Sequence, residues 1–142
     1  MVALAKLRLI DSLSETAGAL KDALDADACA ISRVLGDVLV LVTGCSPADR
    51  SLLSGQGYLI SEFPETREVI ATRRPRAICV TDAPTCEAEV TVMRDLGYAA
   101  LLMLPLVLSG EAWGLVEVYR AEPRPFGAAE IRAASAVLAA LG

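Results

Sequence analysis

Four cysteines are the residues with the widest chemical repertoire in this sequence: Cys29, Cys45, Cys79 and Cys86. A thiolate can act as a nucleophile, a redox centre or a metal ligand. No two of them lie two to four residues apart, so the spacing of a zinc knuckle is missing. The 142 residues include no histidine. This excludes Ser-His and Cys-His nucleophile pairs and any histidine-ligated zinc or haem centre.

Two of the cysteines are expected to differ in reactivity. Cys79 alternates with Ile78 and Val80 in a short strand, which predicts a buried thiol that acts as a small core residue. Cys86 stands just before the expected start of a helix, where the helix dipole lowers a thiol pKa. Redox sensing or covalent attachment of a ligand at Cys86 is therefore an alternative to a purely structural thiol.

The overall composition excludes several classes of protein. The formal net charge is -5 and no basic stripe with interleaved aromatic residues occurs, so nucleic acid is not an expected partner. Hydrophobic residues make up 54% of the chain, yet no window of about twenty residues reads as a membrane span. The N-terminus lacks the apolar block and cleavage site of a signal peptide. We expect one cytoplasmic domain over residues 1–142. Because its last helical pattern runs to the final residue, we expect it to be cut from a longer protein or to end on an interface helix.

Periodicity predicts the elements that position these residues. A helix is expected from about residue 4 to 24, followed by strands over 28–34 and 38–43 with a tight turn between them. A second helix begins near Phe63 and is stopped by Pro75, and a short strand follows over 77–80. A third helix spans 87–96 and ends at Gly97, and a last helix starts at 127 or 128. The mixed segment 45–57 is expected to hold one short helical turn, and a turn is expected at 82–84.

The stretch over residues 101–120 predicts a β-hairpin with two breakers inside its strands. Pro105 cannot donate a backbone hydrogen bond, and Gly114 has no side chain to pack. The sequence therefore predicts a bulge or bend at Pro105 and a close approach of another backbone at Gly114. Paired hairpins favour a largely antiparallel sheet with helices segregated on its faces.

Both end helices carry a narrow apolar stripe. The stripe of the first helix consists of Leu7, Ile10, Leu13, Ala17, Leu20 and Leu24, and that of the last helix of Ile131, Ala134, Leu138 and Leu141. Such stripes are typical of a coiled-coil seam, although a helix packed on its own sheet shows the same spacing. We favour pairing between two copies of the chain, with an interface formed by Leu7, Ile10, Leu13, Leu20, Ile131 and Leu138.

Three segments of the sequence resemble the GAF domain family: LDADACAISRV (24–34), FPETREVIATRRPRAICVTD (63–82) and LGYAALLMLPLVLSGEAWGLVEVY (96–119). The third, with its internal proline and glycine, is the most specific. The resemblance implies an α+β, PAS-related fold with a central antiparallel sheet of five to six strands. The N- and C-terminal helices would pack together on one face, with short helices and loops over the other.

The resemblance further implies a non-enzymatic sensory module of a signalling protein, which binds a small molecule, forms a homodimer and regulates an output domain. A ligand cavity would take its walls from Tyr58, Phe63, Cys79, Cys86, Met93, Arg94, Tyr98 and Met103, with Arg94 as the partner of an anionic ligand. The alternative is that Tyr98 and Met103 belong to the strand core and that Arg94 is an exposed position on a short helix. The sequence names no cofactor and no metal. The family's bilin-attachment pattern of cysteine and adjacent histidine is missing. Two alternatives stay open: a thiol-based reductase of the free-methionine sulfoxide reductase type using Cys79 and Cys86, and a purely structural dimerisation module.

Overall fold

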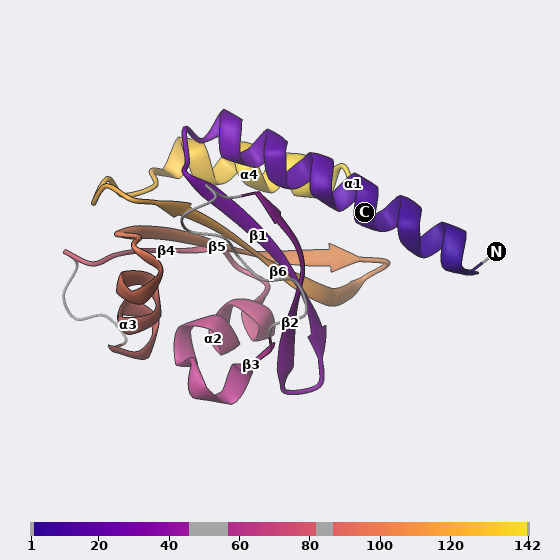
Figure 1. Cartoon of the computed structure of the whole chain (residues 1–142), viewed down its shortest axis with the longest axis horizontal. Coiled ribbons are helices and arrows are strands. Elements are labelled where there is room, and N and C mark those ends of the chain that lie inside the picture. Colours follow the sequence, from indigo (N-terminus) through magenta and orange to yellow (C-terminus); the bar gives the residue numbers. More distant parts are fainter. Residues whose placement is uncertain (1, 46–56, 82–86, 142) are drawn as a thin grey trace.

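The computed structural model describes residues 2–45, 57–81 and 87–141 and shows a six-stranded antiparallel sheet between two layers of helices (Figure 1). The helices are α1 (Val2–Ala23), the 3-10 helix η2 (Ile60–Glu62), α2 (Pro64–Thr72), α3 (Glu87–Leu96) and α4 (Ala128–Ala139). The strands are β1 (Ala28–Leu35), β2 (Val38–Cys45), β3 (Gly57–Leu59), β4 (Arg76–Cys79), β5 (Ala100–Leu108) and β6 (Glu111–Arg120). Their order in the sheet is β3-β2-β1-β6-β5-β4.

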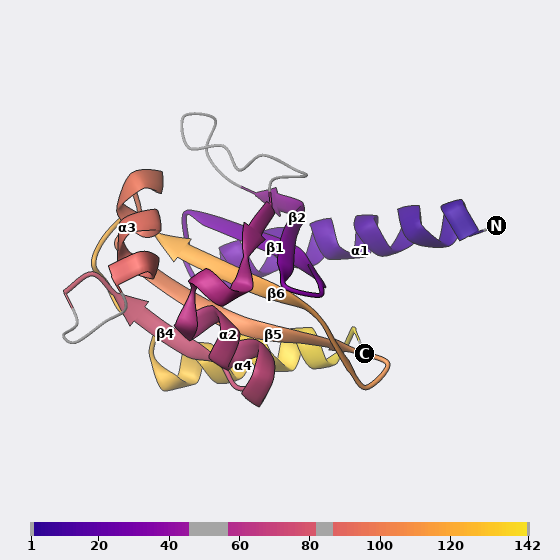
Figure 2. The same cartoon turned by 90° about the horizontal axis from the view of Figure 1, so that it is seen from below.

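The two end helices lie side by side over one face of the sheet, and α2 and α3 lie over the other (Figures 1 and 2). This arrangement confirms the predicted fold class. The segment 45–57, in which a helical turn is expected, lies outside the described residues except at its two ends. The turn expected at 82–84 lies wholly outside them. None of the described helices is long and apolar enough to span a membrane.

The apolar stripe of α1 packs on the chain's own sheet. Leu13 and Leu20 are fully buried and join Ile31 of β1 in one core cluster, and Leu138 of α4 belongs to the same cluster. The sequence analysis favoured pairing between two copies of the chain and kept packing of the helix on its own sheet as the alternative. The structure shows this alternative for Leu13 and Leu20 of α1. It follows from the sheet itself, whose residues on this face are apolar and offer α1 a surface to cover.

Of the six predicted interface residues, only one is described as exposed. Ile10 is 38% exposed and Ile131 is half-buried, whereas Leu13, Leu20 and Leu138 are enclosed within the chain. The side chain of Leu7 lies outside the described residues. A surface for a second copy would therefore have to use Ile10 and the outer sides of the helices.

The β5–β6 hairpin contains both predicted irregularities. The register shifts between Leu106 and Val107, one residue beyond Pro105. At Gly114, a Cβ atom would lie 2.2 Å from the Ser32 carbonyl oxygen of β1. The glycine is therefore required by the close approach of two backbones, because any side chain there would overlap β1.

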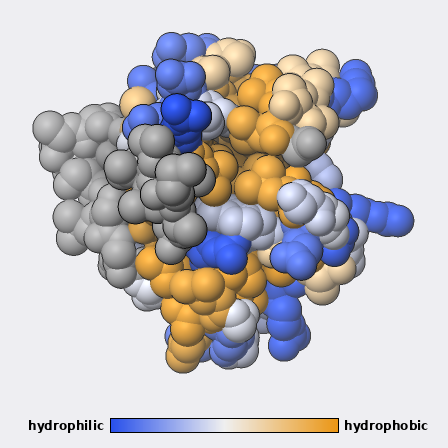
Figure 3. All heavy atoms as spheres, turned by 90° about the vertical axis from the view of Figure 1, so that its right-hand side faces the viewer, coloured by the Kyte–Doolittle hydropathy of each residue, from blue (hydrophilic) through white to orange (hydrophobic). Residues whose placement is uncertain are grey.

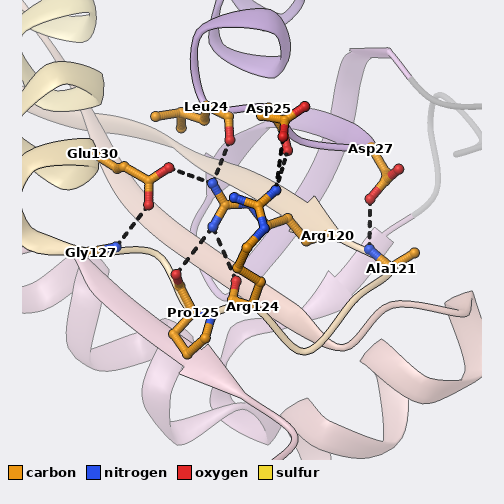
Figure 4. A network of polar contacts seen from close by, with 9 residues as sticks. All are labelled: Leu24, Asp25, Asp27, Arg120, Ala121, Arg124, Pro125, Gly127 and Glu130. Carbon is orange, nitrogen blue, oxygen red and sulfur yellow. Dashed lines mark hydrogen bonds and ion pairs between the residues drawn. The ribbon is translucent and has the colours of Figure 1, made fainter.

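A buried arginine at the end of β6 joins the sheet to both end helices (Figure 4). The side chain of Arg120 is 1% exposed. Its guanidinium donates to the carbonyl oxygens of Leu24, Arg124 and Pro125 and forms an ion pair with Glu130. Leu24 directly follows α1, and Glu130 lies in the first turn of α4. Arg120 thus fixes the end of α1 against the beginning of α4, and we call Arg120 with these partners the clamp.

The carboxylate of Glu130 is itself well anchored. It accepts the backbone N–H of Gly127 at 3.0 Å, which caps α4. The hydrogen bond from Arg120, together with this cap, holds the pKa of Glu130 below its ordinary value. The aromatic ring of Phe126 covers the guanidinium of Arg120, with 3.9 Å between the guanidinium carbon and the ring centroid.

Candidate functional site

A cavity of about 50 Å³ lies on the sheet face that α2 and α3 cover. Its described lining comes from β1, β2, β3, β6 and the helices η2, α2 and α3. Apolar side chains form most of the wall: Ala30, Leu39, Leu41, Ile60, Phe63, Val92 and Leu96. Polar groups are set among them: Ser32, Tyr58, Thr66, Glu89, Glu117 and Tyr119. A mostly apolar wall with a few polar groups is typical of small-molecule sites.

Strand alternation places the polar groups of β6. Glu117 and Tyr119 line the cavity, whereas Val116 and Val118, which alternate with them, join the core beneath α1 and α4. Arg120 follows Tyr119 and therefore lies on the helix side. Strand β6 thus carries cavity residues on one face and, on the other, Arg120, which joins the two end helices.

Helix α3 contributes a buried carboxylate to the cavity. Glu89 is 4% exposed and lies one turn before Met93, which is also buried. One carboxylate oxygen, Oε1, accepts hydrogen bonds from the hydroxyl and the backbone N–H of Thr66 in α2. Burial raises the pKa of Glu89, and the nearby charge of Glu65 adds to this, while the bonds from Thr66 act in the opposite direction.

A second carboxylate enters from β6. Glu117 accepts a hydrogen bond from the Tyr119 hydroxyl at 2.6 Å. Burial raises the pKa of Glu117 to about 7, the bond from Tyr119 lowers it, and the charge of Glu89 raises it further. Burial and Glu117 together raise the pKa of Tyr58 and, more strongly, that of Tyr119. Both tyrosines therefore remain neutral donors at ordinary pH.

The described lining holds no lysine or arginine. The nearby cation Arg76 is engaged outside the cavity, with Glu65 at 3.1 Å and Glu68 at 3.7 Å. Within the described ranges, no three side chains of the metal-ligating types form a cluster. The described lining of the cavity is therefore acidic.

The whole-chain comparisons agree with the observed architecture. The GAF domain family model matches residues 8–142. The chain belongs to the GAF domain family. No curated protein matches this GAF domain.

Solved structures show the same fold at low sequence identity. The blue-light absorbing form of the Thermosynechococcus elongatus PixJ GAF domain is 24% identical with a TM-score of 0.78, over 97% of this chain and 85% of that one. The phycoerythrobilin-bound GAF domain of a cyanobacterial phytochrome is 19% identical with a TM-score of 0.82, over 95% and 83%. The phycocyanobilin-bound GAF domain of a cyanobacterial phytochrome is 20% identical with a TM-score of 0.81, over 97% and 86%.

Two of the predicted site residues line the cavity of this GAF domain. Tyr58 of β3 and Phe63, which precedes α2, meet edge to face with 6.1 Å between their ring centroids. Three others are buried on the same side of the sheet, behind the wall. Tyr98 stacks on Tyr119 at 4.9 Å between centroids, and the Met103 sulfur lies 3.4 Å from the Thr66 hydroxyl oxygen. Met93 is the third.

The remaining predicted site residues lie elsewhere. Cys79 is fully buried in the core beneath α1 and α4, on the opposite face of the sheet. Arg94 is exposed on α3 and does not line the cavity, because the inward face of that helix carries Glu89 and Met93 instead. Cys86 lies outside the described residues.

Sequence reasoning missed the groups that give the cavity its character, namely Ser32, Glu89 and Glu117. The two glutamates each had a signal in the sequence. Glu117 is the polar residue at an alternate position of an otherwise apolar strand. Glu89 precedes Met93 by four residues and therefore shares its helix face.

Proposed function

We propose that this GAF domain is a cytoplasmic sensory module that binds a small molecule in the cavity over β1 and β6 and conveys its occupancy to an attached output domain. The observation that carries the proposal is the cavity itself, in which buried polar side chains face an otherwise apolar space. Polar groups removed from water require hydrogen-bond partners. A bound ligand would supply them.

The bilins named for the neighbouring structures do not suit the described cavity. About 50 Å³ is far below the roughly 300 Å³ at which drug-sized sites begin. Its described lining contains no cysteine, and the whole sequence contains no histidine. We therefore propose a ligand much smaller than a tetrapyrrole.

Strand β6 offers a direct route from the cavity to the end helices. Glu117 and Tyr119 touch the cavity, and the next residue, Arg120, holds the end of α1 to the start of α4. The backbone N–H of Asp27 also donates to the carbonyl oxygen of Tyr119 at 2.8 Å. A ligand that prefers one position of β6 would shift the balance between two arrangements of the helices.

The end helices are also the proposed site of dimerisation. A groove between α1, the β5–β6 hairpin and the end of α4 is lined in part by Leu9, Leu108, Trp113 and Leu141. Figure 3 shows apolar surface on the end of the molecule that faces right in Figure 1, the end from which the first turns of α1 project. Sedimentation equilibrium should show a dimer that Ile10→Glu weakens; a monomer at all concentrations would contradict dimerisation.

Thermal-shift screening tests the binding function. Nucleotides, amino acids, amines, carboxylic acids and tetrapyrroles would each be added to the wild-type protein and to Ala30→Phe, which fills the cavity from β1. Leu35→Phe is the matched control, because Leu35 lies on the same strand but is exposed. We expect a compound that raises the melting temperature of the wild type and of Leu35→Phe but not of Ala30→Phe. Stabilisation that survives cavity filling, or no stabilisation by any class, would contradict the proposal.

We propose binding in preference to thiol catalysis. Cys79 is buried on the face away from the cavity, so its thiol is not positioned to react with a bound substrate. Turnover of free methionine sulfoxide that is lost in Cys79→Ser or Cys86→Ser would support the reductase alternative instead. The purely structural module would require a filled interior, whereas the described cavity leaves space beside polar groups.

A further inference from the structure

The charges of the cavity point to the class of ligand that it takes. Glu89 of α3 and Glu117 of β6 both line it, one from the helix layer and one from the sheet. The charge of Glu89 raises the pKa of Glu117. The described lining provides no positive side chain to balance them. Two carboxylates that share an apolar cavity are stabilised when a cation joins them.

Hydrogen-bonding groups in the wall of the cavity give an independent indication. Ser32 is 5% exposed and lines the cavity, so its hydroxyl is placed to meet a molecule bound there. In Glu89, both hydrogen bonds from Thr66 go to Oε1, and Oε2 can accept hydrogen bonds from a ligand. A ligand that donates to such oxygens exchanges their hydrogen bonds to water for direct ones.

We propose that the cavity binds a small organic cation, a primary amine or amidinium on a short apolar body, between Glu89, Glu117 and Ser32. This deepens the proposed function, on which it rests. The cationic N–H groups would donate to the two carboxylates and to the Ser32 hydroxyl. The apolar body would lie against Leu39, Leu41 and the other aliphatic wall residues.

Other small ligands suit these groups less well. An anion would meet two carboxylates and no arginine or lysine in the described lining. A metal ion prefers several ligating groups at once, and the described residues hold no such cluster. An organic cation uses both the charge and the apolar wall, and charge-assisted hydrogen bonds are about twice as strong as neutral ones.

Three flat molecules of nearly equal shape and different charge test this inference: benzamidine, benzamide and benzoate. Each would be titrated into the full ¹⁵N-labelled chain and followed by NMR, with affinities from calorimetry. We expect benzamidine to bind at least about tenfold more tightly than benzamide, with benzoate weaker still. The amide signals of Ser32, Glu117 and Tyr119 should shift upon binding.

Conservative variants separate a specific role from a structural one. Glu89→Gln and Glu117→Gln keep the side-chain shape and should each weaken benzamidine by about tenfold while leaving benzamide within about twofold. Glu68→Gln removes an exposed carboxylate of α2 outside the cavity and should change neither. Binding of benzamidine should also weaken below about pH 7, because Glu117 takes up a proton there. The other described titratable groups that line the cavity are Glu89, Tyr58 and Tyr119.

Each outcome supports or overturns the inference. Equal or tighter binding of benzamide or benzoate would overturn the preference for a cation, while binding in the cavity would still agree with the proposed function. Binding of benzamidine that both glutamine variants retain would overturn the assigned residues. If none of the three molecules binds, the inference fails, and the thermal-shift screen with Ala30→Phe decides separately whether the cavity binds another class of ligand.

Discussion

Replacing Glu117 with glutamine should stabilise the folded protein at alkaline pH. The pKa of this carboxyl is raised from 4.5 to about 7, chiefly by burial. Between these two values, the folded chain keeps a proton that the unfolded chain has lost. The free energy of unfolding therefore falls as pH rises through this range. A glutamine side chain, which never ionises, removes this contribution.

The size of the effect follows from the two pKa values. Each pH unit between 4.5 and about 7 lowers the free energy of unfolding by about 1.4 kcal/mol, so the total approaches about 3 kcal/mol. Glu117→Gln should accordingly gain little at pH 5 and up to about 3 kcal/mol at pH 8, relative to the wild type. Glu89 interacts with Glu117 through its charge, so the difference reports Glu117 together with this interaction.

Urea unfolding between pH 5 and 8.5, followed by circular dichroism, measures this directly. Glu68→Gln is the matched control, because it makes the same chemical change at an exposed position outside the cavity. If Glu117→Gln is no more stabilised at pH 8 than at pH 5, then Glu117 is not held in a buried, proton-retaining environment. The electrostatic description of the cavity would then be wrong.

Three further predictions concern the framework. Gly114→Ala should lose about 2–3 kcal/mol of stability in urea unfolding, because its Cβ would overlap the Ser32 carbonyl oxygen; unchanged stability would show that the two backbones lie farther apart. Arg120→Met should lose about 3–5 kcal/mol, since three carbonyl oxygens lose their donor and Glu130 keeps only its bond to Gly127. A calorimetric melting temperature near that of the wild type would contradict the role of Arg120 in joining the end helices. In a variant whose other two cysteines are replaced by serine, the buried thiols of Cys29 and Cys79 should react with a disulfide reagent only on unfolding. Burial also raises the pKa of Cys29 to about 12. Fast reaction in native buffer would contradict their burial.

Local patterns were sufficient to predict most of the fold. Pro105 and Gly114 interrupt apolar strands at a cost that only a specific geometry offsets, and the structure has the shift and the close approach there. Gly97 ends α3 with a positive φ of 84°, and the Tyr98 N–H bonds to the Met93 carbonyl oxygen at 2.8 Å. These features depend on a few neighbouring residues, so the sequence alone reveals them.

The cavity was harder to predict because it depends on which face each element turns to its neighbours. Alternation shows that Cys79 and Ile78 lie on opposite sides of β4, but not which side faces α2 and α3. The same holds for Arg94 and Glu89 on α3, whose inward face is set by how the helix packs on the sheet. The stripe of α1 also has the same spacing whether its leucines meet their own sheet or a second copy. Only the tertiary arrangement decides these cases.

Hydrogen exchange tests the central claim most directly, namely that occupancy of the cavity reaches the end helices through β6. The wild-type protein would be compared with and without the compound that stabilises it most. We predict slower exchange around Ser32 and Tyr119 in the cavity, and also at residues 24–27 and 127–131, where Arg120 joins α1 to α4. Slower exchange confined to the surface away from β6, with no change at the cavity or at the clamp, would contradict the account.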